Sequence, residues 1–268
     1  MMCERFKVSR SGFYAWLHRP ACTRVAANAE LCAQIRDVHQ QSHEAYGSPR
    51  IYAALKQQGV ACGRHRVAQL MRKMGLAGRA SRLYWSNAGN HAFFQRHANE
   101  KLGMVAPHTV NQLWVGDVTF LKTGSGWQYL AVVMDMFSRR IIGWALANHR
   151  RAALTCEALR MAIHHRKPEA GLWFHSDRGI EYAALEYQAL LTEFGIKPSM
   201  NRPRQCTDNA HMESFFHSLK SEWIHGYRFK GADDLRVAIK QYIEDFYNPV
   251  RLHSGIGYQS PVNMEMVG

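Results

Sequence analysis

Three acidic residues in the second half of the chain lie where an acid is either costly or well placed to bind a cation. Asp117 interrupts the apolar segment 114–119, Asp177 ends the apolar segment 172–177, and Glu213 lies in the first turns of an expected helix. A carboxylate within an apolar strand is costly to bury unless it is paired or bound to a cation. Carboxylates without an accompanying His/Cys cluster suit Mg²⁺ or Mn²⁺, and two such ions can hold the attacking and leaving oxygens of a phosphoryl transfer. Each acid alone could cap a turn or a helix, but together they indicate metal-dependent phosphoryl transfer.

The elements that must position these acids alternate between strands and helices. Short segments rich in Val, Ile and aromatic residues predict strands at 112–121, 127–135, 140–146, 172–177 and 196–200. Helical spacing of apolar residues predicts helices at 151–166, 181–194, 208–225 and 233–247. Three hairpin-joined strands followed by crossover units imply an α/β fold, with a mixed five-stranded sheet flanked by helices.

Positive charge is concentrated in the first 110 residues, which hold 16 Lys/Arg and 5 Asp/Glu, whereas the remainder holds 18 and 16. Between Glu44 and Glu100 there are nine basic residues and no acid. This asymmetry favours a part that binds a polyanion joined to a nearly neutral part, although a solvated basic surface is the alternative. A membrane partner is not expected, because there is no basic amphipathic segment with a broad apolar face and no apolar run long enough to span a bilayer.

The basic part contains a pattern typical of a helix-turn-helix at about 45–76, preceded by a helix at about 28–42. Ser48-Pro49 is a helix start signal, and Gly63 and Gly75 bound a second helix. Apolar residues recur at helical spacing in that second helix and leave a polar, basic face formed by Arg64, Arg66, Gln69 and Arg72. We expect this face to bind DNA, although many small helical domains share the pattern without binding it.

The overall organisation follows from these segments. We expect a basic helical DNA-binding region over 1–100 and a catalytic region with C-terminal helices over 108–268. Six cysteines are scattered without a C-x-x-C pair, so neither a disulfide framework nor a four-ligand zinc site is expected. The first 16 residues carry charges where a signal peptide needs an apolar stretch, which predicts a cytoplasmic protein.

Several sequence segments resemble one family of proteins. Asp117 and Asp177 are separated by 59 residues, and Asp177 and Glu213 by 35, which is the D, D-35-E arrangement of the retroviral-integrase superfamily. The longer segments resemble the OrfB transposases of copy-out–paste-in bacterial insertion sequences: WVGDVTFL, GWQYLAVVMDMFSRRIIGW, HSDRGIEY, DNAHMESFFHSLKSE and YNPVRLHSGIGYQSPVNM. AYGSPRIYAALKQQG resembles the helix-turn-helix of the same proteins, and the resemblance covers roughly residues 5–265.

The resemblance implies an RNase H-like integrase core that acts as a DDE-type transposase, a polynucleotidyl transferase. In that family, metal-activated water frees a 3′-hydroxyl at the element's end, and the hydroxyl then attacks another phosphodiester. Asp117, Asp177 and Glu213 match the metal-binding acids of the family, while Asn209 and Lys220 match positions that contact the DNA end.

The resemblance also implies partners and cofactors. We expect Mg²⁺ or Mn²⁺ as two ions, double-stranded DNA as transposon ends and target, and a homo-oligomer on DNA in the bacterial nucleoid. A helix-turn-helix product of an upstream reading frame is a further candidate partner. Residues 6–17 look like the end of another helix-turn-helix unit that nothing upstream completes, so either this segment packs on its neighbour or the chain works with another polypeptide.

Two other functions fit the residue pattern less well. A DNA-binding regulator with an inactive integrase-like core would not need three intact acids. A retroviral-type integrase should carry an N-terminal zinc motif, which this chain lacks. Outside the acid triad, we interpret Asp135 as a turn-forming acid paired with Ser138 or Arg139, and Arg251 as either a fold-closing residue or a DNA contact.

Overall fold

The computed structural model describes residues 5–6, 8–18, 23–79, 106–201 and 209–267. The chain forms two compact units, Met1–Gly78 and Arg79–Gly268. The expected boundary between 100 and 108 falls largely within 80–105, outside the described residues, so that boundary stays a prediction.

The first unit contains the expected pair of short helices packed on a longer one. These are α3 (Thr23–Gln41), α4 (Ser48–Gln57) and α5 (Arg64–Lys73), preceded by α2 (Arg10–Leu17). The apolar residues spaced for burial do form the core: Leu31, Ile35, Val38, Ile51, Leu55, Val67, Leu70 and Met71. Gly63 is the N-cap of α5, and Gly75, with φ of +67°, takes the left-handed conformation that ends it. One detail differs, because Gly47 caps α4 and Ser48 is already its first helical residue.

The second unit is built on a mixed five-stranded sheet, as the alternating elements predict. Its strands are β1 (Leu113–Thr123), β2 (Gly126–Asp135), β3 (Ile141–Ala147), β4 (Trp173–Ser176) and β5 (Lys197–Met200), in the spatial order β3-β2-β1-β4-β5. The first three pair antiparallel through short connections, whereas β4 and β5 run parallel to β1. Parallel strands need crossovers, which α6 (Ala152–Arg166), α7 (Ile180–Ala183) and α8 (Leu185–Glu193) provide.

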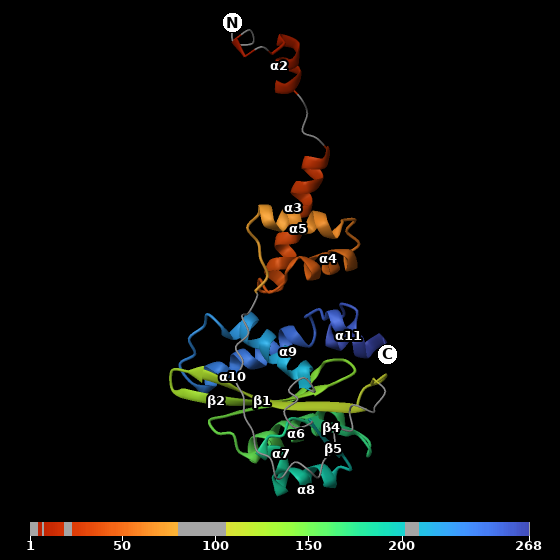
Figure 1. The fold of residues 1–268 in the computed structure, drawn as a ribbon, viewed down its shortest axis with the longest axis vertical. Coiled ribbons are helices and arrows are strands. Elements are labelled where there is room, and N and C mark those ends of the chain that lie inside the picture. The colour runs from red at the N-terminus through yellow and green to blue at the C-terminus, as the bar shows by residue number, and fades with distance from the viewer. Residues whose placement is uncertain (1–4, 7, 19–22, 80–105, 202–208, 268) are drawn as a thin grey trace. The chain divides into compact units, whose positions relative to one another are not determined.

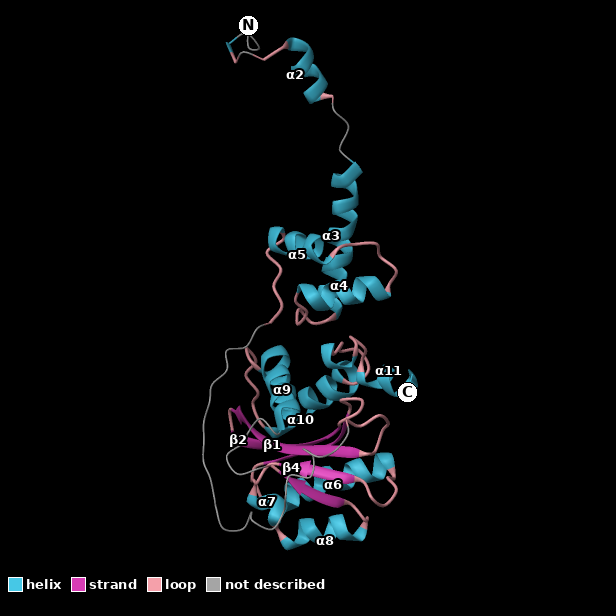
Figure 2. Ribbon diagram, turned by 45° about the vertical axis from the view of Figure 1, so that its right-hand side comes forward, coloured by secondary structure: helices cyan, strands magenta, loops and turns pink. Residues whose placement is uncertain are grey.

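Helices cover both faces of this sheet. Figures 1 and 2 show α6, α7 and α8 on one face and α9 (Ala210–Leu219) and α10 (Ala232–Lys240) on the other. The apolar core on the α6 side joins Trp114 and Phe174 to residues of α6 and α8. Helix α6 packs closely on β3 at Gly143, where a Cβ would lie 2.2 Å from the carbonyl oxygen of Ala158.

The C-terminal helices differ from the expected continuous α-helices. Helix α9 continues as a π-helical segment, η4 (Lys220–Ile224), and α10 continues as another, η5 (Gln241–Tyr247). A 3₁₀ turn, η6 (Ser254–Ile256), and α11 (Pro261–Val267) follow. The helix expected at 181–194 is two helices, because Ala184 has extended backbone (ψ 142°). No helix in the described ranges is long and apolar enough to cross a membrane.

Candidate active site

Two of the three predicted acids lie on neighbouring strands of the sheet centre. Asp117 belongs to β1, and Asp177 directly follows the last residue of β4. The parallel register pairs Gly116 with Ser176, so the two aspartates come next to each other where β4 ends. The absence of a side chain at 116 is required here, because a Cβ would lie 2.5 Å from the ring of Phe174.

Backbone donors hold one oxygen of each carboxylate. The Val118 N–H donates to Oδ1 of Asp117 at 2.7 Å, and the Gly179 N–H donates to Oδ1 of Asp177 at 2.9 Å. Burial raises the pKa of Asp117 well above its usual range, and the nearby Asp177 carboxylate raises that pKa further. The pKa of Asp177 is also raised, first by burial and then by Glu181. Adjacent carboxylates of this kind create negative potential that a cation would relieve.

Sequence reasoning missed an ion pair beside these aspartates. Nε and Nη2 of Arg150 each lie 2.8 Å from Oε1 of Glu181, whose side chain is only 1% exposed. Nη2 of the same arginine is 4.0 Å from Oδ2 of Asp177. Glu181 lies in the HSDRGIEY segment and could have been noticed there, but Arg150 follows β3 in a stretch that carries no chemical signal of its own.

Glu213, the third predicted acid, is exposed on α9. Helix α9 packs on β1, the strand that carries Asp117. Within the part of the chain that the structure describes, however, no group of three or more His, Cys, Asp or Glu side chains converges closely enough to hold a metal ion. The residues immediately before α9, 202–208, lie outside that part.

Asn209 and Lys220 both contact β1 next to Asp117. Asn209 is 2% exposed, and its Nδ2 donates to the carbonyl of Gly116 at 3.2 Å. Lys220 donates from Nζ to Oγ1 of Thr119 at 2.7 Å, and burial lowers its pKa while Asp117 opposes that shift. The buried Asn209 therefore positions α9 on β1, and the half-buried Lys220 places a cation two residues from Asp117 on that strand.

Three residues of the predicted DNA-binding face of the first unit are exposed, and the fourth is hydrogen-bonded within the unit. Arg64, Gln69 and Arg72 are exposed on α5. Arg66 is half-buried, and its Nε donates to Oδ1 of Asn28 on α3 at 2.8 Å. This hydrogen bond ties α5 to α3, a role that helical spacing within α5 could not indicate.

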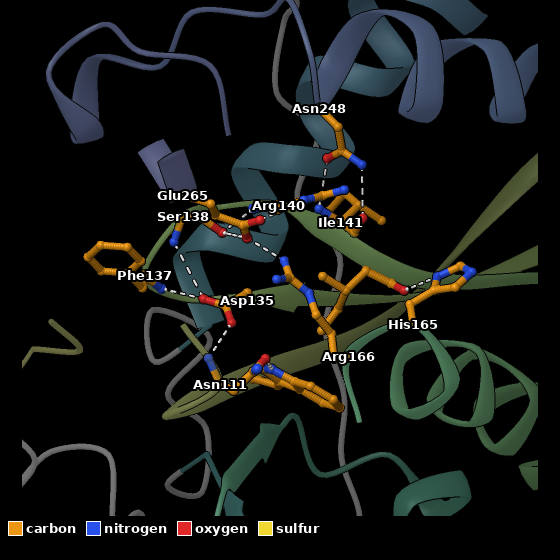
Figure 3. A network of polar contacts seen from close by, with 12 residues as sticks. Asn111, Asp135, Phe137, Ser138, Arg140, Ile141, His165, Arg166, Asn248 and Glu265 are labelled. Atoms are coloured by element: carbon orange, nitrogen blue, oxygen red, sulfur yellow. Dashed lines mark hydrogen bonds and ion pairs between the residues drawn. The ribbon is translucent and has the colours of Figure 1, made fainter. Parts of the chain in front are cut away.

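Asp135 is a structural acid that closes the turn after β2 (Figure 3). It is fully buried and accepts hydrogen bonds from the backbone N–H groups of Asn111 and Phe137, at 2.8 and 2.9 Å. The Ser138 N–H donates to it weakly at 3.4 Å, which agrees with the expected pairing with Ser138. Nearby, Glu265 of α11 accepts hydrogen bonds from three side chains, those of Ser138 and Arg140 in the turn between β2 and β3 and that of Arg166 at the end of α6.

Arg251 closes the fold instead of facing solvent. Its Nη2 lies 2.6 Å from Oε1 of Glu222, and its Nε donates to Oε2 at 2.7 Å. Both side chains are less than 5% exposed, at 3% and 4%. Tyr242 and Ser218 complete the cluster with hydrogen bonds to Glu222 and from Arg251. Of the two roles left open by the sequence, the structure therefore favours the fold-closing one.

Residues of both units match known protein families. Residues 107–206 match a family model described as an integrase core domain, residues 194–261 match a second model of that description, and residues 26–84 match an HTH-like domain. The sheet topology and these matches define the second unit as an integrase core, which confirms the expected RNase H-like fold class.

Similar proteins identify the family to which the whole chain belongs. The chain is 37% identical to transposase InsF for insertion sequence IS3A of Escherichia coli K12, over 98% of this chain and 92% of that protein. It is equally similar, at 37%, to a 31 kDa protein of insertion element IS600 from Shigella sonnei, over 97% and 96% of the two chains. The chain belongs to this family of insertion-sequence transposases. A solved HTLV-2 integrase catalytic core in complex with magnesium is 18% identical, with a TM-score of 0.46, over 59% of this chain and 98% of that one.

Proposed function

We propose that this transposase cuts and joins DNA strands at a DDE-type site formed by Asp117, Asp177 and Glu213. The observation that carries the proposal is the parallel register of β1 and β4, which puts two partly buried carboxylates side by side. A pair of mutually repelling carboxylates has no structural advantage in a sheet centre unless a cation binds there.

The donor set fits divalent magnesium or manganese, because every candidate ligand is a carboxylate oxygen. Asp117 and Asp177 would hold the ions, and Glu213 would join them from α9. We propose two ions; when bound, they activate the attacking oxygen and stabilise the leaving oxygen of the phosphodiester.

The chain's own residues orient these ligands. The N–H groups of Val118 and Gly179 fix one oxygen of each aspartate and leave the other oxygen for a ligand. Glu181 anchors Arg150 beside Asp177, which keeps a positive charge at the rim of the site. Positioning the reacting groups and neutralising charge are the main contributions a protein makes to this chemistry.

A regulator with an inactive core is the alternative function, and one experiment separates the two. Purified full-length protein should cleave and join a DNA fragment carrying the element's end with Mg²⁺ or Mn²⁺, and should do neither in EDTA. A regulator would bind the fragment equally well and leave it intact under both conditions.

The proposed partners are double-stranded DNA, as transposon ends and target, and further copies of this chain on that DNA. The InsF relatives and the HTH-like domain match support the DNA partner. A further proposed partner is the helix-turn-helix product of an upstream reading frame. Helix α2 supports it, because α2 has no buried residue and exposes Phe13, Tyr14, Trp16 and Leu17.

The exposed face of α5 gives a prediction for DNA binding. Arg64→Ala and Arg72→Ala should each weaken binding and lower the slope of log K against log salt by about one unit, because each loses one phosphate contact. Gln69→Ala should instead reduce the preference for the element's end over random DNA, by about 1–3 kcal/mol if it reads a base. Fluorescence anisotropy at several salt concentrations measures both effects.

The matched control is Lys56→Ala, which removes an exposed basic residue from α4 instead of α5. It should leave unchanged both the slope of log K against log salt and the preference for the element's end over random DNA. Arg66→Ala combines loss of a proposed DNA contact with loss of the hydrogen bond to Asn28, so it should also lower the melting temperature. If Lys56→Ala and Arg72→Ala behave alike, the α5 face is not the DNA-binding face.

Lys220 gives a second prediction. Lys220→Ala should weaken DNA binding, lower the salt slope by about one unit and reduce cleavage, because the lysine would hold a phosphate beside the acids. Binding of Mn²⁺, followed by electron paramagnetic resonance, should persist. Lys240→Ala, which removes an exposed lysine at the end of α10, is the control. An unchanged slope together with unchanged cleavage would mean that Lys220 serves only to bond Thr119.

A further inference from the structure

An exposed aromatic pair lies on the β1–β2 hairpin. Phe120 is 54% exposed and Trp127 51% exposed, and their ring centroids are 5.3 Å apart in an edge-to-face arrangement (78°). Strand β4 pairs with β1 only as far as Gly116, so the hairpin extends beyond it. Trp127 lies opposite Lys122 in the antiparallel register, and alternation along β1 puts Phe120 and Lys122 on one face. The three side chains therefore form one continuous surface.

Both rings are flanked by lysines. Nζ of Lys122 lies 5.9 Å from the ring centroid of Trp127, and Nζ of Lys220 lies 5.1 Å from that of Phe120. Exposed aromatic rings beside cations are the chemistry with which proteins bind single-stranded nucleic acid, since bases stack on the rings and cations hold the backbone.

This surface is close to the acids. Phe120 lies three residues beyond Asp117 on β1, about 10 Å along the strand, so alternation directs its side chain to the opposite face of β1 from that of Asp117. At about 3.4 Å per nucleotide in a stacked strand, a path of that length or longer spans at least about three nucleotides. Lys220 links the two faces, because it donates to Thr119, which shares the face of Asp117, and lies over the ring of Phe120.

We propose that Phe120 and Trp127 form a stacking platform for unpaired bases of the DNA strand next to the reacting phosphodiester, with Lys122 and Lys220 on its backbone. The inference rests on the proposed function for its choice of substrate. A second copy of the chain is the other conceivable occupant, but lysines are depleted from the buried centres of protein interfaces, and here a lysine flanks each ring.

The test measures binding of full-length protein, in EDTA, to two fluorescent DNA duplexes of one sequence. One duplex is blunt, and the other carries a 3′ tail of four unpaired thymidines. Wild-type protein should bind the tailed duplex more tightly. Phe120→Leu and Trp127→Leu keep apolar bulk but remove the π face, and each should weaken tailed-duplex binding about tenfold while leaving blunt-duplex binding unchanged.

A control variant distinguishes base stacking from a general loss of DNA binding. Phe194→Leu alters an exposed aromatic residue at the end of α8 and should change neither affinity. The platform is overturned if the leucine variants weaken both duplexes equally, if they change neither, or if they only dissociate an oligomer in analytical ultracentrifugation. This binding assay contains EDTA and does not depend on catalysis. A wild-type protein that fails to cleave DNA in the separate assay with Mg²⁺ or Mn²⁺ would therefore refute the proposed function but leave the binding result unchanged.

Discussion

Replacement of Asp117 or Asp177 by asparagine, or of Glu213 by glutamine, is expected to lower DNA cleavage and joining by about a thousandfold or more. The reason is that metal ions contribute several kcal/mol of transition-state stabilisation, and a neutral amide is a poor ligand for a hard cation. DNA binding should be almost unaffected, because the positive charge of the chain lies elsewhere. Gel assays of cleavage and joining with Mg²⁺ or Mn²⁺, beside anisotropy for binding, measure the two effects.

The control for these variants is Asp135→Asn. Asp135 is also an aspartate and is fully buried, but its side chain accepts hydrogen bonds in the turn after β2 (Figure 3). Folded Asp135→Asn protein should retain cleavage. Substantial cleavage by any one of the three site variants would remove that residue from the proposed site, and cleavage by all three would refute the DDE mechanism.

Arg251→Ala is expected to produce the largest loss of stability, about 3–5 kcal/mol in the free energy of unfolding. Removing one partner of a buried ion pair leaves the other charge buried without compensation, and Glu222 is 4% exposed. Glu222 would keep the hydrogen bond from Tyr242 but lose those that Arg251 donates to both of its carboxylate oxygens. Urea titration of the full chain, followed by circular dichroism, measures the change.

Two further variants test whether burial is the cause of this loss. Lys240→Ala breaks an exposed ion pair with Glu244 (3.9 Å; side chains 64% and 42% exposed), and it should cost less than about 1 kcal/mol. The double variant Arg251→Met, Glu222→Leu removes both charges and should recover most of the lost stability. If Arg251→Ala costs no more than Lys240→Ala, the buried pair does not stabilise the fold.

The sequence alone determined the sheet and the helix-turn-helix, because both depend on local patterns of residues. Short segments rich in Val, Ile and aromatic residues, separated by turn residues, located all five strands, and helical spacing located α3, α4 and α5. It also indicated that Asp117 and Asp177 serve one metal site, whereas the parallel register that puts them side by side came from the structure. The two π-helical segments were not predictable, because their apolar spacing is close to that of an α-helix.

Only the tertiary structure decided which distant side chains meet. Arg150 donates a hydrogen bond to Glu181, Arg251 to Glu222, and Arg66 to Asn28, across sequence separations of 31, 29 and 38 residues. Such contacts depend on the register between strands and on the packing of helices, which no local pattern of residues specifies. For the same reason, the aromatic pair on the hairpin becomes a surface only when β1 and β2 align Lys122 with Trp127.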